Sequence, residues 1–215
     1  MIYKPPMDPY LNVVYQDDDV LVLNKPSGLL SVPGRQVIHK DSLQSRAQQQ
    51  YPTATTVHRL DMETSGLILM ALNKTSHVNL SRQFEQREIS KQYRARVFGH
   101  LHSASGQVEA PLICDWPNRP RQMVDYEKGK AALTHWQVIE AETQTTLVEL
   151  KPVTGRSHQL RVHMMSIGHP IVGDPLYAND KALNFASRLA LQSQSISFQA
   201  LQDGSEMNFH LPADF

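Results

Sequence analysis

A single aspartate, Asp61, is the residue of this sequence with the clearest potential for acid–base or nucleophilic chemistry. It lies in the segment VHRLDMETSGLILMAL, between the basic pair His58–Arg59 and an apolar run that predicts a buried strand. Burial raises the pKa of a carboxyl group, so a reactive, ionised aspartate here needs a cation or hydrogen-bond donors nearby. One cation at about 4 Å contributes about 4 kcal/mol at an effective dielectric constant near 20, which is enough to offset such a shift.

Three arginines are candidate partners for this carboxylate: Arg59, Arg156 and Arg161. Arg161 falls in the first turns of a helix predicted from SHQLRVHMMSIG, with Ser157 as its N-cap. The planar guanidinium group of arginine can pair with a carboxylate through two parallel hydrogen bonds, so Arg161 suits a bidentate contact. An ion pair that only fixes the loop is the alternative explanation, because structural pairs also shift pKa values.

A tyrosine bordered by cations is the third feature. The segment KQYRARVFGHL alternates as a strand does, which places Tyr93 on one face while Lys91 and Arg94 lie close to it in the sequence. An aromatic ring among cations can stack on a nucleobase while the cations hold phosphates. Packing in the hydrophobic core is the alternative role for a tyrosine in a strand.

Several other chemistries have no support in the sequence. It contains no glycine-rich phosphate loop, no GxGxxG fingerprint, no HExxH motif and no GxSxG elbow. His158 and His163 are five residues apart, a spacing that does not stack two metal ligands on one helical face. Cys114 is interpreted as a small buried apolar residue. We therefore predict no metal site and no bound cofactor.

The composition is that of an ordinary globular protein. The 215 residues carry a formal net charge of zero, with 40% hydrophobic and 20% charged residues. The single cysteine indicates a reducing compartment, and the sequence has neither a secretory signal pattern nor an apolar run of bilayer length. These features predict a cytoplasmic protein. Basic residues gather in the segments 82–96 and 151–163, which can build a positive face on a neutral molecule.

The elements that must position these residues follow from the hydrophobic pattern and the turn residues. Helices are predicted at 41–52 (with Asp41 as N-cap), 74–88 and 157–168. Strands are predicted on both sides of an acidic turn at 17–19, and at 66–72, 91–101, 106–110, 132–139, 145–152, 194–200 and 206–211. Strands outnumber helices without regular alternation, which predicts an α+β fold around a mainly antiparallel sheet.

One polar, proline-rich loop stands out from the predicted connections. The segment CDWPNRPRQM would expose Trp116, and loops of this kind often carry function on a rigid scaffold. A plain connection is the alternative.

Four separated motifs give the chain a family resemblance: NKPSG at 24–28, HRLDMETSG at 58–66, KQYRA at 91–95 and GRSHQLRVH at 155–163. Together they resemble the RluA family of pseudouridine synthases, and HRLD followed by TSG is the most specific of them. The segments GLLSVPG, PLICDWPNRP, GHPIVGD and PADF are similar to the members of that family that modify both ribosomal and transfer RNA.

The resemblance implies a pseudouridine synthase fold with a central active-site cleft, and it implies roles for particular residues. Asp61 matches the catalytic aspartate that acts on the ribose of a flipped-out uridine, and Arg161 matches the arginine that pairs with it. Tyr93 matches the tyrosine that stacks on the flipped base and is a candidate for removing the proton at carbon 5. Arg59 matches the basic residue that fills the gap left in the RNA.

Further residues are assigned around this catalytic group. Lys25 and Gly66 are expected to support the active-site loop. RNA binding is expected from Arg59 together with His58, Lys91, Arg94 and Arg156.

The implied substrates are a 23S rRNA hairpin (uridine 746) and the tRNA anticodon stem-loop (uridine 32). We expect one catalytic domain, 1–215, without an N-terminal S4-like RNA-binding domain, acting as a monomer. Pseudouridine formation is intramolecular and redox-neutral, so it needs no cofactor. Glycosidases use two carboxylates, whereas here the detached base is reused and one acid can suffice.

Three questions stay open at this point. Asp61 could attack the anomeric carbon, or it could remove the 2′ proton of the sugar to give a glycal. The chain could instead be a non-catalytic RNA-binding or ribosome-assembly module. A nucleoside hydrolase is a third reading, which the missing second acid disfavours.

Overall fold

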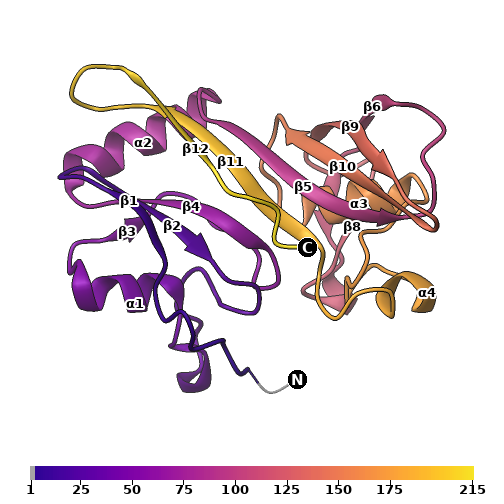
Figure 1. Cartoon of the computed structure of the whole chain (residues 1–215), viewed down its shortest axis with the longest axis horizontal. Coiled ribbons are helices and arrows are strands. Elements are labelled where there is room, and N and C mark those ends of the chain that lie inside the picture. The colour runs from indigo at the N-terminus through magenta and orange to yellow at the C-terminus, as the bar shows by residue number, and fades with distance from the viewer. Residues whose placement is uncertain (1–2) are drawn as a thin grey trace. The chain divides into compact units, whose positions relative to one another are not determined.

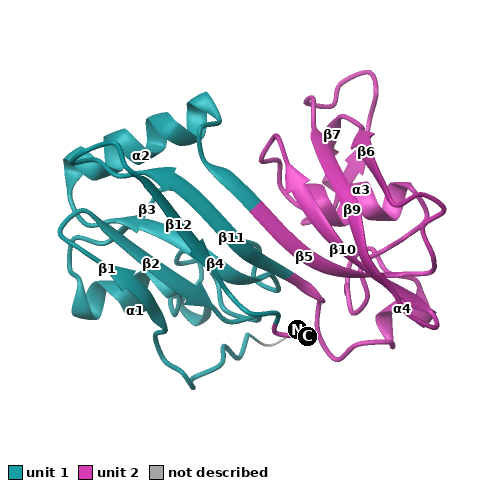
Figure 2. Ribbon diagram, turned by 45° about the horizontal axis from the view of Figure 1, so that its top comes forward, with its two compact units in different colours: residues 1–91, 192–213 teal, residues 92–191, 214–215 magenta. Residues whose placement is uncertain are grey.

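The structure is a computed structural model that describes residues 3–215. The described residues fall into two compact units (Figure 2). Unit 1 comprises the residues up to 91 together with 192–213, and unit 2 comprises 92–191 together with 214–215. Figure 1 shows the elements in chain order. Within residues 3–215 we find no helix with the length and apolar character needed to cross a membrane.

Unit 1 is built on a sheet with the strand order β1-β2-β4-β11, in which β12 also pairs with β11 and β3 with β4. β11 runs parallel to β4, whereas the other pairs are antiparallel. The bounds are β1 (Val13–Gln16), β2 (Val20–Lys25), β3 (Thr55–Thr56), β4 (Ser65–Ala71), β11 (Leu191–Gln199) and β12 (Glu206–His210). Every residue of β4 is buried, as expected for a central strand covered on both faces.

Two helices of unit 1 lie on opposite sides of these strands (Figure 1): α1 (Leu43–Gln50) and α2 (Lys74–Gln86). On the α2 side, Leu80 packs with alternate β4 residues, Leu67 and Leu69, in one hydrophobic cluster. Because side chains alternate along a strand, Ile68 and Met70 point to the other face. Burial on both faces fixes the position of β4, and this strand begins directly after the Asp61 loop.

Unit 2 contains a second set of strands in the order β5-β10-β9-β6, all antiparallel. Their bounds are β5 (Ser90–Phe98), β6 (Ser105–Glu109), β9 (Leu133–Ala141) and β10 (Thr145–Pro152). Helix α3 (Gln159–Ser166) packs Leu160 and Met164 against β5 and β10 in a buried cluster that includes Ala95, Val97 and Val148.

Smaller elements complete the chain. A two-stranded sheet in unit 2 joins β7 (Leu112–Cys114) to β8 (Gln122–Val124), and the loop between them holds the 3-10 turn η2 (Trp116–Asn118). Leu112 of β7 packs with Val162 of α3 and with Tyr177. The remaining elements are η1 (Val37–His39) in unit 1 and α4 (Asp180–Leu183) in unit 2.

The α+β prediction is confirmed, but two predicted helix caps are wrong. Ser42, not Asp41, caps α1, because the Ser42 hydroxyl accepts from the Ser45 N–H while Asp41 accepts two hydrogen bonds from Arg46. Helix α3 begins after His158, whose backbone is left-handed (φ 53°), rather than after Ser157. The structure also contains small elements that the hydrophobic pattern does not indicate, among them β3, β7, β8 and α4.

Candidate active-site residues

The backbone on both sides of Asp61 is fixed by hydrogen bonds to the segment that follows β2. Before it, Leu60 exchanges two hydrogen bonds with the Ser31 hydroxyl, its N–H donating at 3.1 Å and its carbonyl accepting at 2.7 Å. After it, the Met62 carbonyl accepts from the Gly28 N–H at 2.9 Å. The Asp61 side chain itself is half-buried. The backbone around Asp61 therefore has a defined position, while the half-buried side chain is not removed from solvent.

Lys25 is the buried centre of this arrangement. Its ammonium group donates to three carbonyl oxygens, those of Pro26 (2.9 Å), Leu29 (2.7 Å) and Met62 (2.9 Å), and the residue is fully buried. Three N–H donors thus meet three acceptors, which satisfies the group completely. Because Met62 follows Asp61 directly, Lys25 ties the aspartate loop to the segment after β2.

Burial lowers the pKa of Lys25 to about 7, and the negative charges of Glu63 and Asp61 oppose that shift. A lysine in the unfolded chain titrates near 10.4. Between these two values the unfolded chain binds more protons than the folded one, so the free energy of unfolding should rise with pH in this window.

We therefore expect the unfolding free energy of the natural protein, minus that of a Lys25→Met variant, to increase from pH 7 to 9.5. The limiting slope for one group is about 1.4 kcal/mol per pH unit. Urea titrations of both proteins across this range measure it, and the subtraction removes groups that titrate alike in both. A difference that stays flat would contradict the buried, neutralisable lysine.

Gly66 opens β4 in a conformation that only glycine adopts easily. Its φ is +105°, and a Cβ atom built on it would lie 2.7 Å from the backbone N of Ser193 in the neighbouring strand β11. Real Cβ atoms do not approach backbone so closely, so a side chain here would push β11 away from β4. Gly66 thereby lets β4, which begins at Ser65, four residues after Asp61, run close beside β11.

His58 lies just before Asp61 and is uncharged at neutral pH. Its Nε2 accepts a hydrogen bond from the backbone N–H of Leu69 at 2.9 Å, and its ring lies 4.7 Å from that of Phe84. Burial, and secondarily the charge of Lys91, lowers the pKa of His58 to about 3. Its predicted contact with RNA stays a prediction, and at neutral pH it would be made by a neutral ring.

In unit 2, Arg161 makes a bidentate ion pair with Asp174, a residue that no sequence pattern relates to it. Its Nε donates to Oδ2 of Asp174 at 2.8 Å and its Nη2 to Oδ1 at 2.7 Å, and both side chains are buried. Asp174 Oδ1 also accepts from the backbone N–H groups of Leu176 (2.8 Å) and Tyr177 (3.2 Å). The geometry expected of Arg161 is present, but with this partner; its pairing with Asp61 stays a prediction.

Tyr177 connects Arg161 to its surroundings. The guanidinium carbon of Arg161 lies 5.1 Å from the centre of the Tyr177 ring. The Tyr177 hydroxyl is 2.6 Å from Nδ1 of His158 and accepts from the backbone N–H of Gln122 in β8 at 2.7 Å. Three segments therefore position Arg161. The 174–177 turn contacts it directly, and the start of α3 and the β7–β8 hairpin hold Tyr177 against it.

The other predicted residues of unit 2 are arranged as follows. Tyr93 is half-buried and packs on the unit 2 core, where it lies opposite Leu150 of β10. Arg94 points to the other face of β5, and its Nε is buried without a hydrogen-bond partner among residues 3–215. Arg156 is exposed and donates to the Ala131 carbonyl at 3.1 Å.

The two predicted cations of unit 1 differ in exposure. Arg59 is exposed. Lys91 is half-buried beside Phe84, at 5.6 Å from the ring centre, and burial lowers its pKa. Arg59 is therefore the more accessible of the two to a phosphate.

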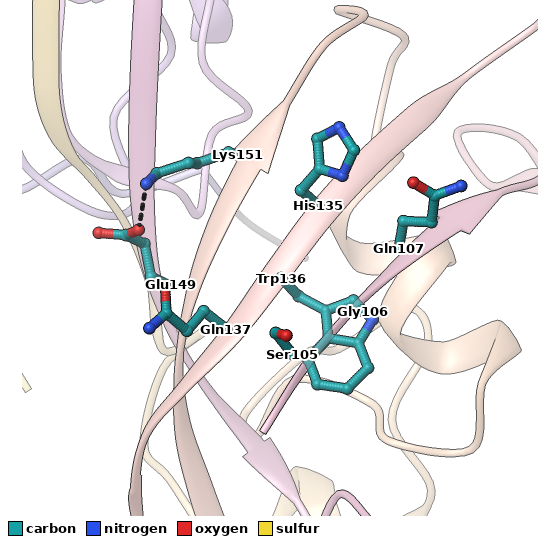
Figure 3. A pocket seen from close by; sticks show the side chains of 8 residues that line it. All are labelled: Ser105, Gly106, Gln107, His135, Trp136, Gln137, Glu149 and Lys151. Carbon is teal, nitrogen blue, oxygen red and sulfur yellow. Dashed lines mark ion pairs between the residues drawn. The ribbon is translucent and has the colours of Figure 1, made fainter. Parts of the chain in front are cut away.

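An open pocket with a volume of 390 Å³ lies elsewhere on unit 2 (Figure 3). It is formed by β6, β9 and β10, and Glu149 pairs with Lys151 across part of it at 2.7 Å. None of the predicted site residues is among those that line it: Ser105, Gly106, Gln107, His135, Trp136, Gln137, Glu149 and Lys151. Among the described residues, no group of three or more histidine, cysteine or acidic side chains is arranged to hold a metal ion.

Comparison with known proteins places these features in a family. The model of the RNA pseudouridylate synthase family matches residues 19–166, a stretch that contains Lys25, Asp61, Tyr93 and Arg161. Among curated proteins, the dual-specificity RNA pseudouridine synthase RluA of Salmonella typhi is 55% identical over 99% of this chain and 98% of that protein. The protein of the same name from Escherichia coli K12 shows the same identity and coverage, and that from Vibrio parahaemolyticus is 50% identical over 99% of this chain and 87% of its own length.

Solved structures agree with the sequence relatives. Human RNA pseudouridylate synthase domain containing 1 superposes with a TM-score of 0.80 and 29% identity, covering 97% of this chain and 86% of that one. Human RNA pseudouridylate synthase domain containing 4 superposes with a TM-score of 0.74 and 26% identity, covering 94% of this chain and 88% of that one. The motifs, the fold and these relatives agree, and this chain belongs to the RNA pseudouridylate synthase family.

Proposed function

We propose that this protein is a dual-specificity RNA pseudouridine synthase that isomerises particular uridines in a 23S rRNA hairpin and in the tRNA anticodon stem-loop. The identity of 55% over 99% of the chain to curated proteins of that name carries the proposal. We further expect it to act in the cytoplasm, as a monomer and without a cofactor.

Asp61 is the proposed catalytic residue. Its backbone is held on both sides by Ser31 and Lys25, so its half-buried carboxylate can meet a ribose in a fixed orientation. In the reaction the bond between uracil N1 and the sugar C1′ breaks, a bond from C5 to C1′ forms, and C5 loses a proton while N1 gains one, so product and substrate are isomers. One carboxylate suffices because the uracil is reattached rather than released. Attack at C1′ and removal of the 2′ proton are both compatible with this single acid.

Tyr93 and Arg161 are the proposed partners in the reaction. Tyr93 would stack on the flipped base, which must leave the RNA stack to be reached, and is a candidate for taking the C5 proton. Arg161 would stabilise the ionised form of Asp61. Asp174 already holds this guanidinium through Nε and Nη2, so Arg161 is fixed in orientation before substrate arrives. The exposed Arg59 would occupy the space that the uridine leaves.

The proposal is tested with RNA labelled with tritium at C5 of uridine. The purified protein should release tritium from both an rRNA hairpin and a tRNA anticodon stem-loop, and mapping of the products should find pseudouridine at one position in each. Mapping total RNA from cells with and without the gene gives the same answer in vivo. Tight RNA binding without tritium release would instead indicate a non-catalytic RNA-binding module, and free uracil would indicate a hydrolase.

A further inference from the structure

The loop between β7 and β8 exposes a tryptophan beside an arginine. Trp116 is 66% exposed, and the guanidinium carbon of Arg119 lies 4.4 Å from the centre of its ring. Both residues lie within or next to the turn η2. The indole face is thus available to another molecule at a place where a guanidinium group is also exposed, a pairing that exposure of a ring by itself does not supply.

Hydrogen bonds within the loop make it a defined platform. The Asp115 N–H donates to the Arg121 carbonyl at 3.0 Å, and the Asn118 and Arg121 N–H groups donate to the Asp115 and Asn118 carbonyls at the same distance. Pro117 and Pro120 further restrict the backbone. Because little chain entropy is left to lose, a ligand can bind this loop at low cost.

The charge of the loop favours an anionic ligand. Asp115 is its one acidic residue in the sequence from 115 to 122, and both carboxylate oxygens accept from the Asn118 amide, at 3.1 and 3.0 Å. The same segment contains two positive charges, those of Arg119 and Arg121, and Arg119 is exposed. An exposed indole next to guanidinium groups fits an unpaired nucleotide, whose base stacks on the ring while its phosphate meets an arginine.

The base of the loop is attached to the surroundings of Arg161. Gln122 donates its backbone N–H to the Tyr177 hydroxyl, and Arg121 lies 5.5 Å from the Tyr177 ring. Tyr177 in turn packs on Arg161. Gln122 is six positions after Trp116 in the chain, so their Cα atoms are at most about 22 Å apart. The exposed ring is therefore tethered near the surroundings of Arg161, and an RNA stem-loop that presents a uridine there can bring another unpaired nucleotide to Trp116.

From these observations we propose that Trp116 and Arg119 bind an unpaired nucleotide of the RNA substrate outside the catalytic group, with Trp116 stacking on the base and Arg119 contacting the phosphate. This inference rests on the proposed function. The loop acts on binding and on the choice between substrates, not on the chemical step.

Two variants test the stacking role. Trp116→Ala should weaken binding of an anticodon stem-loop about 5- to 150-fold, the range expected when a base loses one aromatic platform. Trp116→Phe should recover most of that loss, since it keeps a flat ring. KM for tritium release should rise with the loss of affinity while kcat at saturating RNA stays unchanged. A matched control is Tyr126→Ala, which removes another exposed ring (78% exposed) from unit 2 and should leave affinity unchanged.

A direct readout comes from fluorescence, because the chain has two tryptophans and the Trp116→Phe variant removes one of them. The difference in emission between the natural protein and this variant should be quenched when the stem-loop binds.

Unchanged affinity and unchanged KM for both RNAs in Trp116→Ala would overturn the inference while tritium release still upheld the proposed function, and the exposed ring would then point to a protein partner. Trp116-dependent RNA binding without any tritium release would have the opposite meaning: the docking role would stand and the proposed function would fail.

Discussion

Replacing Asp61 by asparagine should abolish pseudouridine formation while RNA binding persists. Asparagine has nearly the same shape and keeps the backbone contacts on both sides, which run through Ser31, Gly28 and Lys25. It cannot ionise, so it can neither attack C1′ nor remove the 2′ proton. Loss of such a group lowers the rate on the order of 10⁴-fold or more. The measurement is tritium release under single-turnover conditions, with binding of the same RNA followed in parallel.

The matched control for this experiment is Asp18→Asn, which removes one negative charge from an exposed position of the same unit. It should leave the rate unchanged, and both variants should bind RNA at least as tightly as the natural protein, because each removes one negative charge. Release by Asp61→Asn at even a tenth of the natural rate would be incompatible with a catalytic Asp61.

The features that could be predicted from the sequence are those encoded locally. The apolar run after Asp61 predicts β4 because a short continuous apolar run that follows turn residues is typical of a buried strand, and all seven residues of β4 are buried. Alternation predicts β5, where Ala95 and Val97 are indeed buried and Tyr93 shares their face. The motif at 24–28 indicates support for the aspartate loop, although nothing local indicates that Lys25 would bind three carbonyl groups.

The features that could not be predicted depend on contacts between distant segments. Asp174 is separated from Arg161 by 13 positions and a reversal of the chain, so no helical or strand period relates them. Burial lowers the pKa of His58, and this burial depends on its place against β4, where its Nε2 accepts from the N–H of Leu69, eleven residues away. The strands β7 and β8 are three residues each, too short to show alternation, and only their pairing defines them.

The second large effect is expected from Asp174→Asn, which should lower the free energy of unfolding by about 3–5 kcal/mol, the usual cost of breaking a buried ion pair at one partner. The asparagine oxygen can still accept from the N–H groups of Leu176 and Tyr177. Its NH₂ group, however, would face Nε of Arg161, and the negative charge that Asp174 places against the buried guanidinium would be lost. The substitution therefore measures the effect of losing the Asp174 charge while the hydrogen bonds of the 174–177 turn are kept. Urea denaturation followed by circular dichroism measures the change from the shift in midpoint at unchanged slope.

The control uses the exposed pair Glu149–Lys151, whose side chains are 25% and 50% exposed. Glu149→Gln should change stability by less than about 1 kcal/mol, since solvent screens such pairs. Arg161→Lys completes the comparison: it keeps the charge but cannot make both hydrogen bonds to Asp174, so it should lose activity as well as stability. If Asp174→Asn and Glu149→Gln cost the same, the buried pair does not position Arg161, and the loss of activity in Arg161→Lys would have to arise from the guanidinium's contact with the substrate instead.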